Sequence, residues 1–348
     1  MDSRCKPDIV APGNCLAAVT GEPNLYQPTG NWTSFATPVV TGVIGLLVQK
    51  AKLEPNLSEA LSPESGNCVI KAVLMNSADK LAFWHKGSAS KEDDHIAPLD
   101  YIQGAGMVNA LAAYKQLTAG RQNPGDVPTA GWDLNRLEEN QTLQNAYQLT
   151  IADANAKILT ATLVWNRHYN DSYPFEPLPE KDADIRLELW AVNPDNPSED
   201  YLLDYSDSTA DNVEHIYCSL DPNYKNFDIV VSYSNIDEPQ QILPRQSYAL
   251  AWNVSEKQKS DDIFLYDLNT DGIVDQNDYI VLFVSWVNSI KSPAHYFLGD
   301  INTDGIFDAN DINSLTEQMN RKADWLKTPN SSADEEQTQQ KLLSVSVP

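Results

Sequence analysis

The chain has 348 residues, of which 49 are acidic and 24 basic, so its formal net charge is -25 and its average surface repels nucleic acid and anionic membranes. Because single cores stop growing at about 250 to 300 residues, we expect two or three compact domains. Hydrophobic residues make up 42%, which suffices for packed cores, and no uninterrupted apolar run reaches the ~18 residues of a membrane span. We therefore expect cations as partners, and neither nucleic acid nor membrane insertion.

The cysteines exclude two kinds of site. None of them forms a CxxC pair, so neither a zinc knuckle nor a thioredoxin-type redox pair is expected. They are Cys5, Cys15, Cys68 and Cys218, and both buried thiols and disulfides remain open for them. The first six residues contain no apolar segment, so no signal peptide is expected to start at Met1.

Residues 6–119 alternate short apolar segments with helical ones, a pattern typical of α/β folds. Residues 8–13 are predicted to form a short buried strand that a Pro-Gly pair ends. Residues 33–50 carry apolar side chains on nearly every face at helical spacing, which predicts a buried helix, and Pro38 falls in its first turns, where proline is tolerated. Two further helices are predicted at residues 67–78 and 108–117.

Residues 121–131 are rich in Pro, Gly and Asn and are interpreted as a linker. Strand-like alternation follows at residues 158–165, 185–192, 227–233 and 248–254, with turn residues between them, and this pattern predicts an antiparallel β-sandwich. Residues 328–348 are polar and lack periodicity, so we expect a disordered tail.

Two acidic segments of twelve residues, starting 33 residues apart (300 minus 267), have the spacing of calcium loops. Each has oxygen side chains at positions 1, 3, 5, 9 and 12, Gly at position 6, and a position 7 that offers a backbone carbonyl. The predicted ligands of two Ca²⁺ ions are Asp267, Asn269, Asp271, Ile273, Asp275 and Asp278 in the first loop and Asp300, Asn302, Asp304, Ile306, Asp308 and Asp311 in the second. A pair of polar turns is the alternative, which the repeat disfavours.

Helices are predicted after the loops, at residues 279–287 and 312–321, whereas Pro293 argues against a helix entering the second loop. The loop and exit helix, repeated once, resemble the dockerin family over residues 264–321. This resemblance implies a module whose folding depends on calcium and whose partner is a cohesin domain on a scaffold or cell surface. In that family partner choice is associated with loop positions 10 and 11, here Gln276, Asn277, Ala309 and Asn310.

Residues 30–38 place Ser34 at the start of the apolar helix, where unpaired backbone N–H groups and the positive helix end stabilise a developing oxyanion. An ordinary N-cap at Thr33 or Ser34 is the alternative. Three segments in order, Lys-Pro-Asp-Ile-Val-Ala-Pro-Gly at 6–13, Thr-Ser-Phe-Ala-Thr-Pro at 33–38 and Gln-Gly-Ala-Gly-Met-Val-Asn-Ala at 103–110, resemble the carboxyl-terminal motifs of subtilisin-like serine proteases. The resemblance implies an α/β catalytic domain, a secreted peptidase with Ser34 as nucleophile, and a β-sandwich behind it.

The chain departs from that family in two ways. Trp32 stands where the family usually has Gly, and its bulk is expected to crowd the pocket. The five histidines, His85, His95, His168, His215 and His295, all follow Ser34, and none has the Gly-His-Gly-Thr setting of the family's base. Because a serine without a positioned base is a poor nucleophile, we expect this chain alone to be inert and to derive from a longer protease.

These observations predict a multidomain chain. Its expected parts are a partial α/β subtilisin-like domain (1–120), an antiparallel β-sandwich (121–258), a small α-helical dockerin-type module (259–327) and a tail (328–348). The expected function is that of a fragment of a secreted serine endopeptidase anchored through calcium loops to a cohesin-bearing surface. The alternative is a calcium-dependent binding protein that carries a degenerate protease remnant.

Overall fold

The computed structural model describes residues 4–14, 16–18, 20–21, 26–28, 30, 32–81, 84–87, 95–138, 141–155, 157–234, 243–256, 266–268, 273–291 and 309–321. Two compact units divide the chain, Met1–Lys259 and Ser260–Pro348. The first unit is a mixed α/β arrangement with two large sheets. The predicted tail at 328–348 lies outside the described residues.

Four helical segments form the amino-terminal part of the first unit: α1 (Thr33–Leu53), the 3₁₀ helix η1 (Pro55–Leu61), α2 (Gly66–Asn76) and α3 (Ala110–Thr118). All three predicted helices are confirmed. The helix α1 ends where Pro55 follows, and Lys50 pairs with Glu54 at its carboxyl end. Cations at this end complement the helix dipole, so both features fix the terminus.

The predicted burial of α1 is wrong. Only Val43, Leu47 and Ala51 are buried, whereas Leu46 and Leu53 are 61% and 72% exposed. The reason is that η1, α2 and α3 cover one face of α1 and no described element covers the others. By length and composition α1 could also cross a membrane, a property that core helices and signal sequences share. The search for an uninterrupted apolar run did not find this helix. A mean hydropathy over 18 residues does, because it allows polar residues within the window.

The strands form three sheets. The pair β1 (Leu16–Ala18) and β2 (Tyr26–Pro28) stands by itself. A five-stranded sheet has the order β3 (Gly125–Asp126), β5 (Gln144–Thr150), β10 (Asn226–Tyr233), β7 (Ile185–Val192) and β8 (Tyr201–Ser206). A four-stranded sheet has the order β4 (Ala130–Leu137), β11 (Gln246–Glu256), β6 (Lys157–Trp165) and β9 (Val213–Ser219). The four predicted strands are confirmed as β6, β7, β10 and β11, and all neighbours are antiparallel except β3 and β5.

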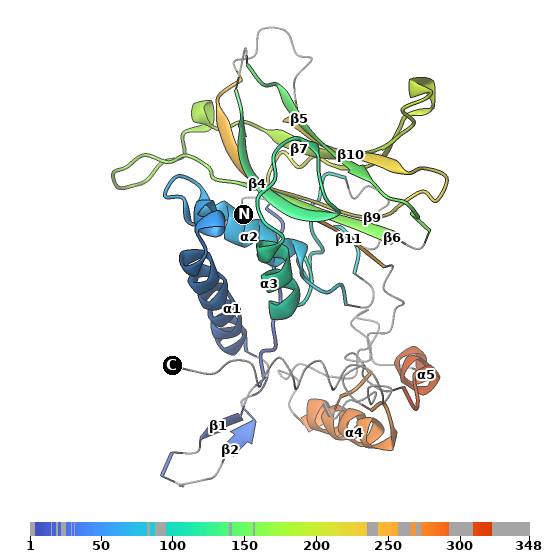
Figure 1. Cartoon of the computed structure of the whole chain (residues 1–348). Coiled ribbons are helices and arrows are strands. Elements are labelled where there is room, and N and C mark those ends of the chain that lie inside the picture. The colour runs from blue at the N-terminus through green and yellow to red at the C-terminus, as the bar shows by residue number, and fades with distance from the viewer. Residues whose placement is uncertain are drawn as a thin grey trace, which may run out of the picture. The chain divides into compact units, whose positions relative to one another are not determined.

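The two large sheets lie next to each other as layers (Figure 1), and residues of both form one hydrophobic core. Alternate residues of β7 and β10, such as Leu187 and Ile229, meet Leu163 and Leu250 of the other sheet in that core. Period-two alternation places such residues on one face of a strand. Each fully buried Leu or Ile contributes about 1.5 to 3 kcal/mol, so this core is the main source of stability for the sheets.

The helix α2 packs on the outer face of the four-stranded sheet (Figure 1). Val69 and Val73 of α2 share a core with Val164, Ala249 and Ala251 of β6 and β11. The amino-terminal helices and the sheets therefore belong to one compact unit.

The segment predicted as a linker is held against this unit by hydrogen bonds. Arg121 bonds Asp133 at 3.0 Å and the Leu134 carbonyl at 2.8 Å, and it also pairs with Glu59 of η1. The Gln122 N–H donates to the Trp132 carbonyl at 2.8 Å. Pro and Gly in this segment consequently mark turns at a sheet edge, and a free linker was the wrong interpretation.

Among the described cysteines, Cys5, Cys68 and Cys218 are free thiols, and the first two are buried. Cys15 lies outside the described residues. Burial raises the pKa of the Cys5 and Cys68 thiols, to about 12 and about 11. Both side chains are therefore protonated at neutral pH and pack as small apolar groups.

The second unit contains α4 (Gln276–Lys291) and α5 (Ala309–Glu317). Its core is made of Tyr266, Val274, Leu282 and Leu315. The Val274 N–H donates to the Arg321 carbonyl at 3.0 Å, and the Asn320 N–H donates back to the Val274 carbonyl at 2.8 Å. These two bonds join the first acidic segment to the residues that follow α5.

Candidate active site and calcium loops

Ser34 lies in the first turn of α1, and its side chain is exposed. Trp32, in an extended conformation, is the N-cap, and no side chain caps the helix. The Phe35 and Ala36 N–H groups both donate to the Trp32 carbonyl, at 3.0 and 3.2 Å. The predicted alternative, in which Thr33 or Ser34 is an N-cap, is therefore wrong. No acidic residue lies in the first turn, so the positive helix end beside the Ser34 hydroxyl is not neutralised there.

Hydrogen bonds join the first sequence motif to each of the other two. The Trp32 N–H donates to the Gly13 carbonyl at 3.1 Å, which joins the first motif to the serine turn. The first motif is joined to the third by bonds from Val10 N–H to the Gly106 carbonyl at 3.0 Å and from Val108 N–H to the Val10 carbonyl at 2.9 Å. The strand predicted at residues 8–13 is reduced to isolated bridges, because only the loop around Gly104 to Val108 pairs with it among the described residues.

Two glycines make this junction possible. Gly104 has a φ of +60°, and a Cβ there would lie 2.5 Å from the Pro7 carbonyl oxygen. Gly106 has a φ of +122°, and a Cβ there would lie 2.2 Å from the Asp79 carbonyl oxygen. Left-handed backbone favours glycine, and the backbone oxygens cannot move aside as a side-chain tip could. Sequence reasoning did not single out these two residues, although the Gly-Ala-Gly spacing was the available signal.

Gly106→Ala is expected to lower the free energy of unfolding of the first unit by at least about 2 kcal/mol, since strain and the backbone clash add. Urea denaturation followed by circular dichroism measures it. Gly42→Ala is the matched control, because no atom lies within 4 Å of a Cβ at this position in the interior of α1. We expect the control to be unchanged or more stable by up to about 1 kcal/mol. Equal stability of the Gly106 variant would contradict the tight junction.

Comparison with known proteins agrees with this geometry. Residues 1–106 match the subtilase family. The chain is also similar to two subtilisin-like proteases of Arabidopsis thaliana. SBT3.12 is 34% identical over 117 residues, and SBT3.10 is 35% identical over 120 residues. These matches cover 31% and 32% of this chain and 13% of each relative, so the chain spans only a small part of the length of these relatives.

The subtilase-like segment has no histidine base beside Ser34 within the described residues. No hydrogen bond, ion pair or ring contact joins any described histidine to α1. His215 contacts the Thr162 hydroxyl at 2.8 Å, and His168 contacts the Asp182 carboxylate at 2.9 Å. The His95 ring stacks on the Tyr205 ring with 3.9 Å between centroids. Burial holds the pKa of His215 well below its usual value, so it is neutral. His295 lies outside the described residues.

Trp32 stands directly before the Thr-Ser pair and is 62% exposed. Its backbone, at 3.0 to 3.5 Å from a Cβ at Gly13, is what packs against the first motif. Phe35 and Val39, four residues apart in α1, are also exposed. Ser34 is therefore preceded and followed in the sequence by large exposed apolar side chains.

Four of the predicted calcium ligands have side chains that the structure describes. Asp267 is 2% exposed and Asp278 is fully buried, while Ile273 and Asp275 are half-buried. Asp278 accepts from the Asp275 N–H at 2.7 Å, and Asp275 accepts from the Asn277 N–H at 2.7 Å. These bonds cap α4, a role that the polar-turn alternative also gives to these side chains.

The other predicted ligands cannot be placed. Asn269, Asp271, Asp300, Asn302, Asp304, Ile306 and Asp308 lie outside the described residues, as does the side chain of Asp311 in α5. No group of three or more His, Cys, Asp or Glu side chains placed to hold a metal ion occurs within the described part of the chain. The described donors nevertheless fit calcium chemically, because buried carboxylates are hard oxygen ligands that a divalent cation stabilises.

Proposed function

We propose that residues 1–106 act as the carboxyl-terminal portion of a subtilisin-like serine endopeptidase domain, with Ser34 as the nucleophile. The observation that carries this proposal is that the first motif is hydrogen-bonded both to the start of α1 and to the third motif, in a segment that matches the subtilase family. In this reaction Ser34 Oγ attacks the peptide carbonyl carbon while its proton passes to a histidine. The oxyanion forms at the positive end of α1, the amine leaves with the proton, and water then hydrolyses the acyl-enzyme.

The proposal places the histidine base and its aspartate outside residues 1–348. Neither the order of the histidines along the sequence nor the recorded contacts of the four described ones offers a base to Ser34. The 348-residue chain by itself is therefore proposed to be inert. The coding sequence upstream of Met1 tests this proposal. In-frame Asp and Gly-His-Gly-Thr motifs support it, and an untranslated region directly before Met1 contradicts it.

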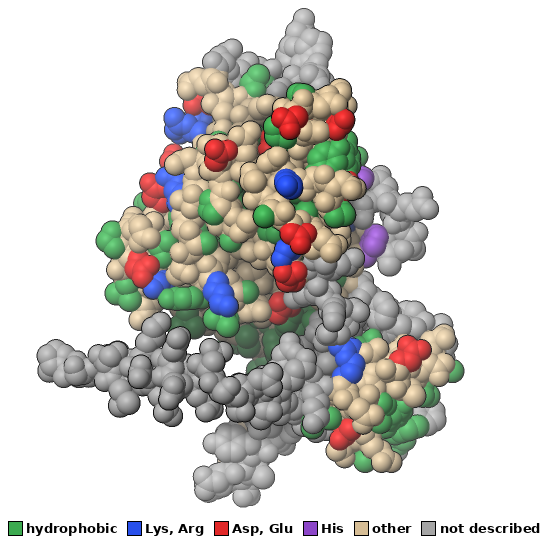
Figure 2. All heavy atoms as spheres, turned by 45° about the vertical axis from the view of Figure 1, so that its right-hand side comes forward, with side chains coloured by type: hydrophobic (Ala, Val, Ile, Leu, Met, Phe, Trp, Pro, Cys, Tyr) green, Lys and Arg blue, Asp and Glu red, His purple; other side chains and the backbone are tan. Residues whose placement is uncertain are grey.

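We further propose that residues 259–327 form a calcium-dependent module of the dockerin type, which holds the protein on a cohesin-bearing scaffold or cell surface outside the cell. The helix α4 supports a protein partner, because Ile280, Phe283, Val284 and Val287 expose an apolar stripe at helical spacing. Figure 2 shows hydrophobic side chains gathered on the surface of this unit. Binding to a panel of immobilised cohesin domains, with calcium and with EDTA, tests the partner.

A non-catalytic calcium-dependent binding protein remains the second candidate. The observation that favours it is the absence of a base beside Ser34 in the described part of the chain. If no peptidase motif precedes Met1 and cohesin binding is retained, this second function holds.

A further inference from the structure

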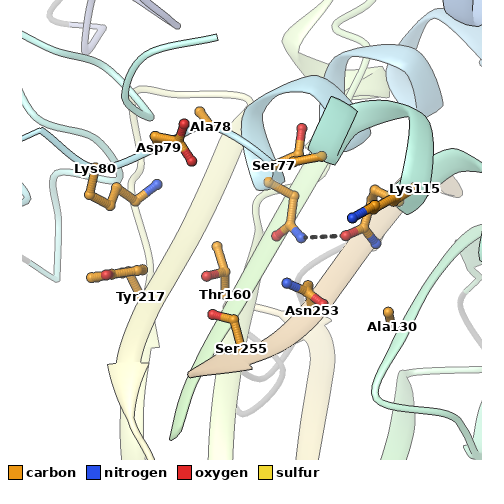
Figure 3. Close-up of a pocket in the computed structure, with 13 residues that line it drawn as sticks. Ser77, Ala78, Asp79, Lys80, Lys115, Ala130, Thr160, Tyr217, Asn253 and Ser255 are labelled. Carbon is orange, nitrogen blue, oxygen red and sulfur yellow. Dashed lines mark hydrogen bonds between the residues drawn. The ribbon is translucent and has the colours of Figure 1, made fainter. Parts of the chain in front are cut away.

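A cavity of about 290 Å³ lies between the helices and the outer face of the four-stranded sheet (Figure 3). Its floor is one cross-strand row: Ala130, Asn253, Thr160 and Tyr217 lie opposite one another on β4, β11, β6 and β9. Its roof is the end of α2 with Asp79 and Lys80, together with Lys115 and Gln116 of α3. Every part of the cavity belongs to the first unit.

The polar side chains of the cavity floor are available for a ligand as far as the described residues show. No hydrogen bond to another described residue is recorded for the side chains of Thr160, Asn253 or Ser255, which all line the cavity. By contrast, the side chains behind them are fully engaged. Gln116 donates to the Gly131 and Trp252 carbonyls at 2.6 and 2.7 Å and accepts from Asn76 at 3.3 Å. A rigid polar wall thus supports a row of available hydroxyl and amide groups.

Lys80 brings a buried cation to this cavity. Its amine bonds the Ala105 carbonyl and lies 4.8 Å from the centre of the Trp84 ring and 5.3 Å from that of Tyr217. One carbonyl and two aromatic faces hold the ammonium, and among the described residues Asp79 is the anion that acts on it. In Figure 3 the Lys80 amine points into the same space as Asp79, Tyr217 and Thr160.

We propose that this cavity binds a small hydroxylated carboxylic acid of about the size of a monosaccharide, such as a sugar acid. When both lysines are protonated, Lys80 and Lys115 against Asp79 leave a local charge of +1 (two minus one) in a chain whose net charge is -25, so the cavity attracts an anion. The ligand carboxylate pairs with Lys80, and its hydroxyl groups bond Thr160, Asn253 and Asp79. The volume of the cavity limits the size of the ligand, since it is at the lower end of the volumes of small-molecule sites.

Burial gives this site a pH dependence. Desolvation lowers the pKa of Lys80 to about 7, while Asp79 opposes this shift. The other groups that face this amine are Tyr217 and the neutral His215 on β9. Because the bound carboxylate requires the charged amine, binding takes up a proton above pH 7. The affinity therefore falls by about tenfold for each further pH unit.

Titration calorimetry of the full chain with galacturonate and with galactose tests the proposal. We expect galacturonate to bind with a dissociation constant below about 1 mM at pH 6, and galactose to bind at least about tenfold more weakly. Lys80→Met and Asn253→Ala should each weaken galacturonate by about tenfold or more, and the affinity should fall from pH 6 to pH 8.5. Lys52→Met, which removes an exposed charge on α1 away from the cavity, is the matched control and should bind as the parent does.

Three results would overturn the proposal: no binding of galacturonate, equal affinity for galactose, or unchanged affinity in the folded Lys80→Met variant. If Lys80→Met does not fold, Asn253→Ala and the pH series decide. These measurements are independent of peptidase activity and of calcium, so failure here leaves the proposed function standing.

Discussion

Saturating calcium is expected to raise the melting temperature of the fragment 260–327 by about 10 to 20 °C above its value in EDTA. The physical reason is that the carboxyl groups of Asp267 and Asp278, at 2% and 0% exposure, are buried oxygen ligands that a bound divalent cation stabilises. A ligand that binds only the folded state at a hundredfold excess over its dissociation constant contributes about 2.7 kcal/mol, which in so small a unit is a large shift. Differential scanning calorimetry measures it.

Two variants sharpen this calcium prediction. Asp267→Asn combined with Asp300→Asn removes the first ligand of each loop and should abolish most of the shift. Glu317→Gln, which removes a carboxylate from the exposed face of α5, should leave it intact. Equal melting temperatures with calcium and EDTA would mean that the acidic segments are polar turns, as the capping bonds of Asp275 and Asp278 allow.

Peptide hydrolysis should fall about a millionfold on Ser34→Ala in a protein that carries the upstream sequence, because loss of the nucleophile removes covalent catalysis. The rate on an unstructured protein substrate measures this effect. Ser58→Ala is the matched control, since the Ser58 hydroxyl bonds the Pro55 carbonyl in η1 and lies outside the three motifs. We expect full activity in the control. Comparable activity in the Ser34 variant would assign the nucleophile elsewhere.

Sequence periodicity predicted the helices and strands whose apolar residues all face the core. The strand β7 follows the period-two rule, with Ile185, Leu187 and Leu189 buried, and its bounds were predicted without error. The strands β4 and β9 were missed because they carry polar residues inward. Asp133 of β4 is buried and accepts a hydrogen bond from Arg121. Glu214 of β9 is buried and accepts hydrogen bonds from the Ser206 hydroxyl and the Ser208 N–H. The partners of these buried carboxyl groups lie 6 to 12 residues away in the sequence, outside the strand itself, so the alternation within the strand does not reveal them.

At the candidate site, too, the sequence predicted some features, and others depend on how the elements pack. The placement of Ser34 at a helix start and the order of the three motifs followed from the sequence, and the hydrogen bonds around Gly13 and Gly106 bring these motifs together. The exposure of α1 was not predictable, because apolar composition does not say which elements are available to cover it. Lys80 was not predicted either. A lone lysine after a helix is ordinarily a surface residue, and only the packing of α2 on the sheet places it over Trp84 and Tyr217.

Labelling by a fluorophosphonate probe, with mapping of the modified peptide, tests the central claim most directly. The account predicts that Ser34 is not labelled in the 348-residue chain, and that it is labelled when the upstream sequence supplies the base, with the label lost in Ser34→Ala. Strong labelling of Ser34 in the 348-residue chain would contradict the proposed absence of a base. No labelling in the extended protein would contradict the assignment of Ser34 as nucleophile.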